Sequence, residues 1–241
     1  MSEQRFQRRR RGEQRRRVLR IAVPTLAVVV VLGLAYVIWF SSLLAVDDVE
    51  VKGLTTLKTA QVEQIADVPV GRPLARLDAT AIEARLARIS RVEKVEVKRS
   101  WPHTVQIVVT ERQAVAWMQE GQEVRAVDQY GVDYRVLAKE PTHLPELRVS
   151  AVDARRRQQA FEAAAGVVVD LRAHAPDVLR QVQHVEAATK DSVLLNLTEG
   201  REVMWGSGSD ADEKIKVLRA LLRIKAARYD VSAPEQPTTR K

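Results

Sequence analysis

Few side chains in this sequence have the types and spacing that catalysis needs. The four histidines lie far apart, with no second histidine or acidic residue at metal-ligand spacing, and the chain has no cysteine. The segment GSGS at residues 206–209 precedes a predicted helix, where phosphate-binding loops are found. It lacks the lysine–serine ending of a Walker loop, and the acids that follow it, Asp210, Asp212 and Glu213, would repel phosphate. The sequence therefore predicts no active site, metal site, cofactor or small-molecule substrate.

A long apolar segment near the N-terminus determines where the rest of the chain works. Residues 21–46 carry no charged side chain, and a helix rising about 1.5 Å per residue makes them long enough to cross a hydrocarbon core of about 30 Å. They are longer than a secretory signal's apolar core and end without a clear cleavage site, which favours a retained anchor. We expect a membrane-spanning helix over residues 21–43, surrounded by lipid. The side chains expected at its interfaces are Arg17, Arg20, Tyr36, Trp39 and Phe40.

Most of the chain's net charge of +8 lies in the segment before this helix. Residues 1–20 contain nine arginines and two glutamates, which leaves a net charge of only +1 for the remaining residues. By the positive-inside rule, an arginine-rich tail beside an apolar helix indicates a cytoplasmic N-terminus. We therefore attribute the basicity to membrane topology and expect no nucleic-acid partner.

The part of the chain after the anchor has signals for two small α+β domains. Residues 44–112 are predicted to have the order β-α-α-β-β. The predicted elements are strands near residues 49–52, 94–98 and 105–109, a helix near residues 59–66, and a second helix that begins near Asp78 or Thr80 and ends near residue 89. Thr80 and Glu83 have capping-box spacing at the start of the second helix. The turn and end of the final hairpin carry its most specific residues, which are Arg99, Trp101, Pro102, Glu111 and Arg112.

Trp101 allows two interpretations. It either covers the end of the sheet beside a stiff Trp101–Pro102 turn, which is the structural interpretation we favour, or it is exposed and anchors a partner.

Residues 113–233 are predicted to form a second domain, a mixed β-sheet with flanking helices. A hairpin over residues 124–137, helices near 153–174 and 209–228 and strands near 182–187, 192–198 and 201–205 precede a last short strand. If that strand lies at a sheet edge, its free N–H and C=O groups would accept a strand from another chain. The partner-binding hypothesis therefore rests on Tyr229, Asp230, Val231 and Ser232, and the alternative is an ordinary closing strand. Residues 234–241 are expected to be a flexible tail.

The order and length of these parts resemble those of the bacterial FtsQ family, called DivIB in Gram-positive bacteria. The segments that carry the resemblance are VDDVEVKGL at residues 46–54 and RVEKVEVKRSWPHTVQIVVTERQAVA at residues 91–116. The resemblance implies a POTRA domain followed by an FtsQ-type β-domain. It also implies a non-enzymatic scaffold of the division machinery, held in the inner membrane at the septum with its domains outside the cytoplasm.

In that family the scaffold links early and late division proteins and helps control septal peptidoglycan synthesis. The resemblance therefore implies FtsB- and FtsL-like bitopic partners, and it implies that Tyr229–Ser232 lie where FtsB extends the sheet. Two other functions remain open from the residues alone. One is an anchored, POTRA-bearing envelope chaperone or secretion factor, and the other is an anchored cell-wall enzyme.

Overall fold

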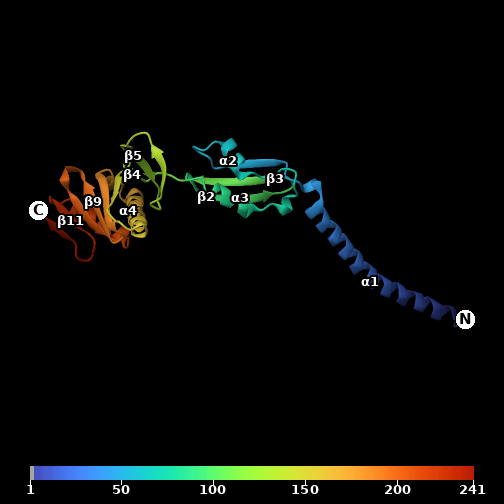
Figure 1. The fold of residues 1–241 in the computed structure, drawn as a ribbon. Coiled ribbons are helices and arrows are strands. Elements are labelled where there is room, and N and C mark those ends of the chain that lie inside the picture. Colours follow the sequence, from blue (N-terminus) through green and yellow to red (C-terminus); the bar gives the residue numbers. More distant parts are fainter. Residues whose placement is uncertain (1–2) are drawn as a thin grey trace. The chain divides into compact units, whose positions relative to one another are not determined.

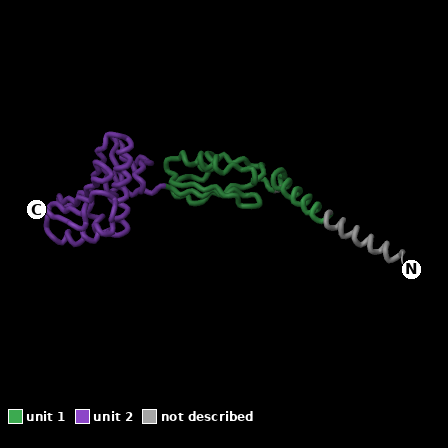
Figure 2. Tube along the Cα trace, turned by 90° about the horizontal axis from the view of Figure 1, so that it is seen from below, with its two compact units in different colours: residues 1–111 green, residues 112–241 purple. Residues whose placement is uncertain are grey.

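The computed structural model describes residues 3–241, with side chains from residue 22 onward except that of residue 43. The described chain divides into two compact units, Met1–Glu111 and Arg112–Lys241 (Figure 2). We call these the N-terminal unit and the C-terminal unit.

The N-terminal unit begins with one long helix, α1 (Glu3–Phe40), which includes Pro24 (Figure 1). Its segment Ala22–Phe40 is long and apolar enough to cross a membrane, and none of it is buried against the rest of the protein. Apolar side chains that the protein leaves uncovered need an apolar surrounding, which supports a lipid environment. The helix ends at Phe40, three residues earlier than the sequence predicted, and Ser42–Leu44 form a 3-10 turn, η1.

The remainder of the N-terminal unit has the predicted β-α-α-β-β order. Its elements are β1 (Asp48–Lys52), α2 (Thr59–Ala66), the 3-10 turn η2 (Leu74–Arg76), α3 (Ala79–Leu86), β2 (Val92–Ser100) and β3 (Thr104–Glu111). The sheet order is β1-β3-β2, with β1 parallel and β2 antiparallel to β3. The core contains Val62 of α2, Ile82 and Leu86 of α3, and alternate residues of β3, so each predicted apolar stripe faces inward.

Helix α3 begins after Asp78, one of the two starts that the sequence predicted, and not at Thr80. Asp78 is its N-cap, and the Asp78 carboxylate accepts a hydrogen bond of 3.0 Å from the Ala81 N–H. Glu83 does not complete a capping box with Thr80, because its carboxylate accepts the Val97 N–H of β2 at 2.8 Å. This bond connects the helix to the sheet.

The C-terminal unit is a nine-stranded mixed sheet with helices packed against it. Its strands are β4 (Ala116–Glu120), β5 (Glu123–Val127), β6 (Asp133–Leu137), β7 (Glu146–Val149), β8 (Val182–Thr189), β9 (Ser192–Leu197), β10 (Glu202–Gly206), β11 (Arg228–Asp230) and β12 (Thr238–Arg240). Its helices are α4 (Ala154–His174), α5 (Pro176–Leu179), the 3-10 turn η3 (Thr198–Gly200) and α6 (Ala211–Leu221). The sheet order is β12-β11-β10-β9-β8-β7-β4-β5-β6. The predicted α+β class is confirmed.

Helix α4 is the main helix that packs against this sheet. It packs against β7, β8 and β9, and α6 packs against α4 (Figure 1). Its buried side chains include Phe161, Ala164, Val168 and Leu171, which are the four that the helical spacing predicted. The sequence missed β4, β7 and α5, and it extended the last helix seven residues too far, since α6 ends at Leu221.

The C-terminus requires a correction. The sequence predicted a flexible tail over residues 234–241, but Thr238–Arg240 form β12, which pairs antiparallel with β11. A turn in which the Gln236 N–H donates to the Ala233 carbonyl at 2.9 Å precedes the returning strand. Pro234 and Pro237 lack N–H groups, but both precede β12, so they do not prevent its pairing.

Candidate partner-binding edge

Of the predicted contact residues, Tyr229 and Asp230 lie in β11, one strand inward from the edge of the sheet, and Val231 and Ser232 directly follow it. Tyr229 and Val231 are buried, and the Tyr229 hydroxyl donates to the Ile224 carbonyl at 2.8 Å. Asp230 accepts hydrogen bonds from the N–H and the hydroxyl of Ser232 at 2.9 and 2.6 Å, which closes a local turn. These four residues therefore have structural contacts within the C-terminal unit. At this end of the sheet, the edge that could receive another strand is therefore β12.

The hydrogen bonds of β11 show which main-chain groups of β12 face outward. The Glu202 N–H donates to the Ala227 carbonyl, and the Val231 N–H donates to the Met204 carbonyl, so these two groups of residues 227 and 231 face β10, whereas the Ala227 N–H donates to the Arg240 carbonyl of β12 at 2.9 Å. Main-chain groups alternate along a strand, so Arg228 and Asp230 face β12. Their register partners, Arg240 and Thr238, face β11 in return. Thr239 consequently directs its N–H and C=O away from the sheet.

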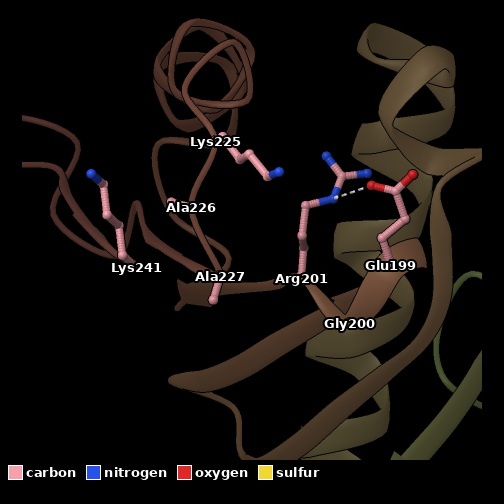
Figure 3. Close-up of a pocket in the computed structure, with 7 residues that line it drawn as sticks. All are labelled: Glu199, Gly200, Arg201, Lys225, Ala226, Ala227 and Lys241. Atoms are coloured by element: carbon pink, nitrogen blue, oxygen red, sulfur yellow. Dashed lines mark ion pairs between the residues drawn. The ribbon is translucent and has the colours of Figure 1, made fainter.

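A cleft of about 580 Å³ lies at the same end of the sheet (Figure 3). Three cationic side chains, those of Arg201, Lys225 and Lys241, line it together with one carboxylate, that of Glu199. Arg201 is held in place because it donates to the Gln181 side chain at 2.9 Å and lies 3.9 Å from Glu199. The remaining lining residues are Gly200, Ala226 and Ala227. The cleft therefore suits an acidic group carried by a chain that runs beside β12.

The hairpin signature of the N-terminal unit contains both exposed and structural residues. Arg99 donates to the Leu77 carbonyl at 2.7 Å and so connects β2 to the chain before α3. Trp101 is 50% exposed in the turn between β2 and β3, and Pro102, which follows a cis peptide bond, is also exposed. The side chain of Trp101 is thus available for contact outside the domain.

Glu111 and Arg112 lie on the two sides of the division between the units. Glu111, at the end of β3, accepts the N–H groups of Thr55, Thr56 and Leu57 and the Thr56 hydroxyl. Burial acts to raise the Glu111 pKa, but these four donors outweigh it and hold the pKa at about 2. The carboxylate is therefore ionised at neutral pH and holds the 55–57 segment against β3.

Arg112 pairs with Asp128, whose side chain is fully buried. The other Asp128 oxygen accepts the N–H groups of Tyr130 and Val132, both at 2.9 Å, and so closes the turn between β5 and β6. Adjacent residues of the chain are thus each attached to a different unit.

The predicted interface aromatics all lie at the C-terminal end of α1. Tyr36, Trp39 and Phe40 are more than half exposed, and the rings of Tyr36 and Phe40 stack with centroids 5.0 Å apart. The guanidinium of Arg76 lies 4.3 Å from the centroid of the Phe40 ring. The side chains of Arg17 and Arg20 lie outside the described part of the structure.

Sequence patterns gave no signal for several residues of this site. Thr239 belongs to a strand of three exposed residues without apolar alternation, and Arg201, Lys225 and Lys241 are ordinary surface cations until the fold brings them together. Among the side chains described, no three His, Asp or Glu residues gather as ligands for a metal ion. The site thus consists of a strand edge with an adjoining cationic cleft.

Known proteins resemble this chain along most of its length. Residues 44–112 match the family model described as POTRA domain, FtsQ-type. The cell division protein FtsQ of Streptomyces coelicolor is 34% identical over 92% of this chain and 91% of its own length. The corresponding protein of Streptomyces venezuelae is 36% identical over 91% of this chain and 83% of its own.

More distant proteins extend this comparison. The cell division protein FtsQ of Mycolicibacterium smegmatis is 34% identical over 89% of this chain and 63% of its own length. A solved extracytoplasmic domain of the division protein DivIB from Geobacillus stearothermophilus aligns with 43% of this chain and 85% of its own, at 19% identity and a TM-score of 0.33, too low to support an argument about the fold. Identity above 30% over nine-tenths of the chain is decisive, and the chain belongs to the FtsQ family of bacterial cell division proteins.

Proposed function

We propose that this chain is a non-enzymatic, membrane-anchored scaffold of the bacterial division machinery. In this proposal α1 crosses the inner membrane with its N-terminus in the cytoplasm, and both units work outside the cytoplasm at the division septum. The scaffold links early and late division proteins and helps control septal peptidoglycan synthesis. Membership of the FtsQ family supports the role in division, and the uncovered apolar segment Ala22–Phe40 supports the anchor.

The partners in this proposal are FtsB- and FtsL-like bitopic division proteins. The observation that carries this part is the outer edge of β12, the last strand of the nine-stranded sheet, where the Thr239 N–H and C=O face away from β11. A partner segment in extended conformation would pair with these groups and add a tenth strand. Its flanking acidic residues would then lie beside the cations of the cleft.

Thr239→Pro tests the strand-addition model. Proline removes the outward N–H, and each lost hydrogen bond costs about 1 kcal/mol with the ring adding a steric clash, so we expect binding of an FtsB-type partner to weaken roughly tenfold or more. The measurement is biolayer interferometry with the full chain in nanodiscs and the partner's extracytoplasmic segment in solution. Thr239→Val is the matched control, since it keeps the N–H and should bind as the natural chain does. Undiminished binding by Thr239→Pro would rule out pairing at β12.

Lys225→Glu tests the contribution of the cleft. Reversing one of its three cations should slow association with an acidic partner segment at low salt, and the difference should shrink as salt screens it. The control is Lys216→Glu, which makes the same change at an exposed position on α6 that does not line the cleft. Equal association rates for the two variants at low salt would show that the cleft takes no part in binding.

A further inference from the structure

One end of the N-terminal unit's sheet lies beside the end of α1. The Val46 N–H donates to the Arg72 carbonyl at 2.9 Å, and the Gly71 N–H donates to the Val46 carbonyl at 2.8 Å, which ties the loop before η2 to the segment that follows the helix. The Asp47 N–H donates to the His103 carbonyl at 2.9 Å, which ties the β2–β3 turn to the same segment. The loop and the turn therefore both lie next to the chain that emerges from α1.

A side chain of this domain touches the last residue of the helix itself. The Arg76 guanidinium lies 4.3 Å from the Phe40 ring centroid, and only Ser41–Asp47 separate α1 from β1, with a 3-10 turn shortening that connection. The segment Ala22–Phe40 spans about 28 Å at about 1.5 Å per residue, close to the thickness of a hydrocarbon core. Phe40 then lies at the edge of that core, and the headgroup layer, several ångströms deep, begins where the domain begins.

This end of the domain exposes apolar side chains that the fold does not use. Trp101 in the turn is 50% exposed and Val70 in the loop is 64% exposed. Arg72 and Arg76 are exposed beside them and can extend their charged groups toward water or phosphate. Tryptophan is the side chain most typical of the membrane–water interface, because its ring is apolar and its indole N–H is polar. We call Val70, Arg72, Arg76 and Trp101 the membrane-proximal patch.

We propose that the membrane-proximal patch docks in the headgroup layer of the membrane that holds α1, with Trp101 and Val70 inserted at the interface. This inference rests on the membrane anchor of the proposed function. The occupant is a lipid surface, because only the short segment Ser41–Asp47 connects the anchor to the domain that carries the patch. The domain is then held against the bilayer at two places, by α1 and by the β2–β3 turn, which restricts its swinging about Ser41–Asp47.

The charges around the membrane-proximal patch indicate whether its docking depends on the charge of the lipid. Asp47 and Asp48 are both exposed on the segment that is hydrogen-bonded to the loop carrying Arg72, and His103 lies 3.8 Å from Asp47. The two arginines are therefore offset by two aspartates, and the patch has no excess of positive charge. Contact must depend on the apolar side chains, so docking occurs on neutral lipid as well as on anionic lipid.

Nitroxide labels on single cysteines test this inference, and the natural chain helps because it contains no cysteine. The full chain is reconstituted in vesicles of phosphatidylcholine, with or without phosphatidylglycerol, with a label at Val70→Cys. Collisions with dissolved oxygen and with a water-soluble nickel chelate are measured by electron paramagnetic resonance. We expect a label at Val70 to show high oxygen and severalfold lower nickel accessibility than a label at Lys58→Cys, near the opposite end of the domain where Glu111 binds the 55–57 segment.

Two further variants separate the possible failures. A label at Val29→Cys in α1 reports on the anchor, so a water-exposed label there refutes the proposed anchor, whereas a lipid-exposed Val29 with a water-exposed Val70 refutes only the docking. Trp101→Ala should raise nickel accessibility at Val70, and Trp101→Phe should restore most of the protection. Low accessibility to both reagents at Val70 would mean burial against protein, and docking only on anionic vesicles would mean an electrostatic contact. Either result overturns the inference.

Discussion

Asp128→Ala should destabilise the C-terminal unit by about 3–5 kcal/mol, because it removes the carboxylate from a buried ion pair. Asp128 is fully buried, pairs with Arg112 through one oxygen and accepts two main-chain N–H groups through the other. The substitution removes the carboxylate that Arg112 faces and opens the turn between β5 and β6. Hydrogen exchange of the full chain in detergent, resolved by peptide mass spectrometry, measures the loss over residues 112–137.

Variants of the same hairpin make this prediction specific. Asp128→Asn keeps an oxygen for the Tyr130 and Val132 N–H groups but loses the charge opposite Arg112, so it should fall between the natural chain and Asp128→Ala. Asp133→Ala is the matched control, since Asp133 pairs with Arg125 at 2.7 Å on the exposed side of the hairpin, where such a pair contributes less than about 1 kcal/mol. If hydrogen exchange over residues 112–137 were as slow in Asp128→Ala as in Asp133→Ala, the Arg112–Asp128 pair would not stabilise the C-terminal unit.

Glu111→Gln should destabilise the N-terminal unit by about 2–3 kcal/mol, because hydrogen bonds to a charged acceptor are stronger than those to a neutral one. The carboxylate accepts the N–H groups of Thr55, Thr56 and Leu57, which lie 54 to 56 residues away in sequence. Hydrogen exchange at residues 53–57 should therefore increase before exchange elsewhere in the unit. Glu50→Gln is the control, because Glu50 is exposed on β1 and pairs only with exposed or partly exposed polar groups.

The same carboxylate gives the N-terminal unit a pH dependence. The pKa of Glu111 is about 2 in the folded unit, against an ordinary value of 4.5. Because the folded pKa is the lower one, the stabilisation is fully present above pH 4.5 and is lost as the pH falls from 4.5 toward 2. Stability of the natural chain should thus decrease over this window, and Glu111→Gln should show a smaller decrease. Parallel acid profiles for the two chains would contradict the assignment.

Local patterns in the sequence determined the elements of this protein wherever the period was strong. The apolar run before residue 47 predicted the helix that the structure places at Ala22–Phe40, and alternation predicted β1, β2 and β3. These elements are encoded locally because a helix or a half-buried strand repeats its apolar side chains every few residues. The family resemblance came from the same segments. The order of the anchor and the domains could therefore be predicted from the sequence alone.

The tertiary structure decided which groups are exposed at the site. The sequence placed the binding edge at Tyr229–Ser232, but Tyr229 and Asp230 are paired with β12, whose three exposed residues have no apolar period to reveal it. The cations of the cleft come from the residue after η3, the residue after β12 and the chain before β11, and the donors to Glu111 come from more than fifty residues away. The order of the strands in the sheet and the long-range hydrogen bonds depend on contacts between distant segments. They therefore cannot be predicted from the spacing of residues within one segment.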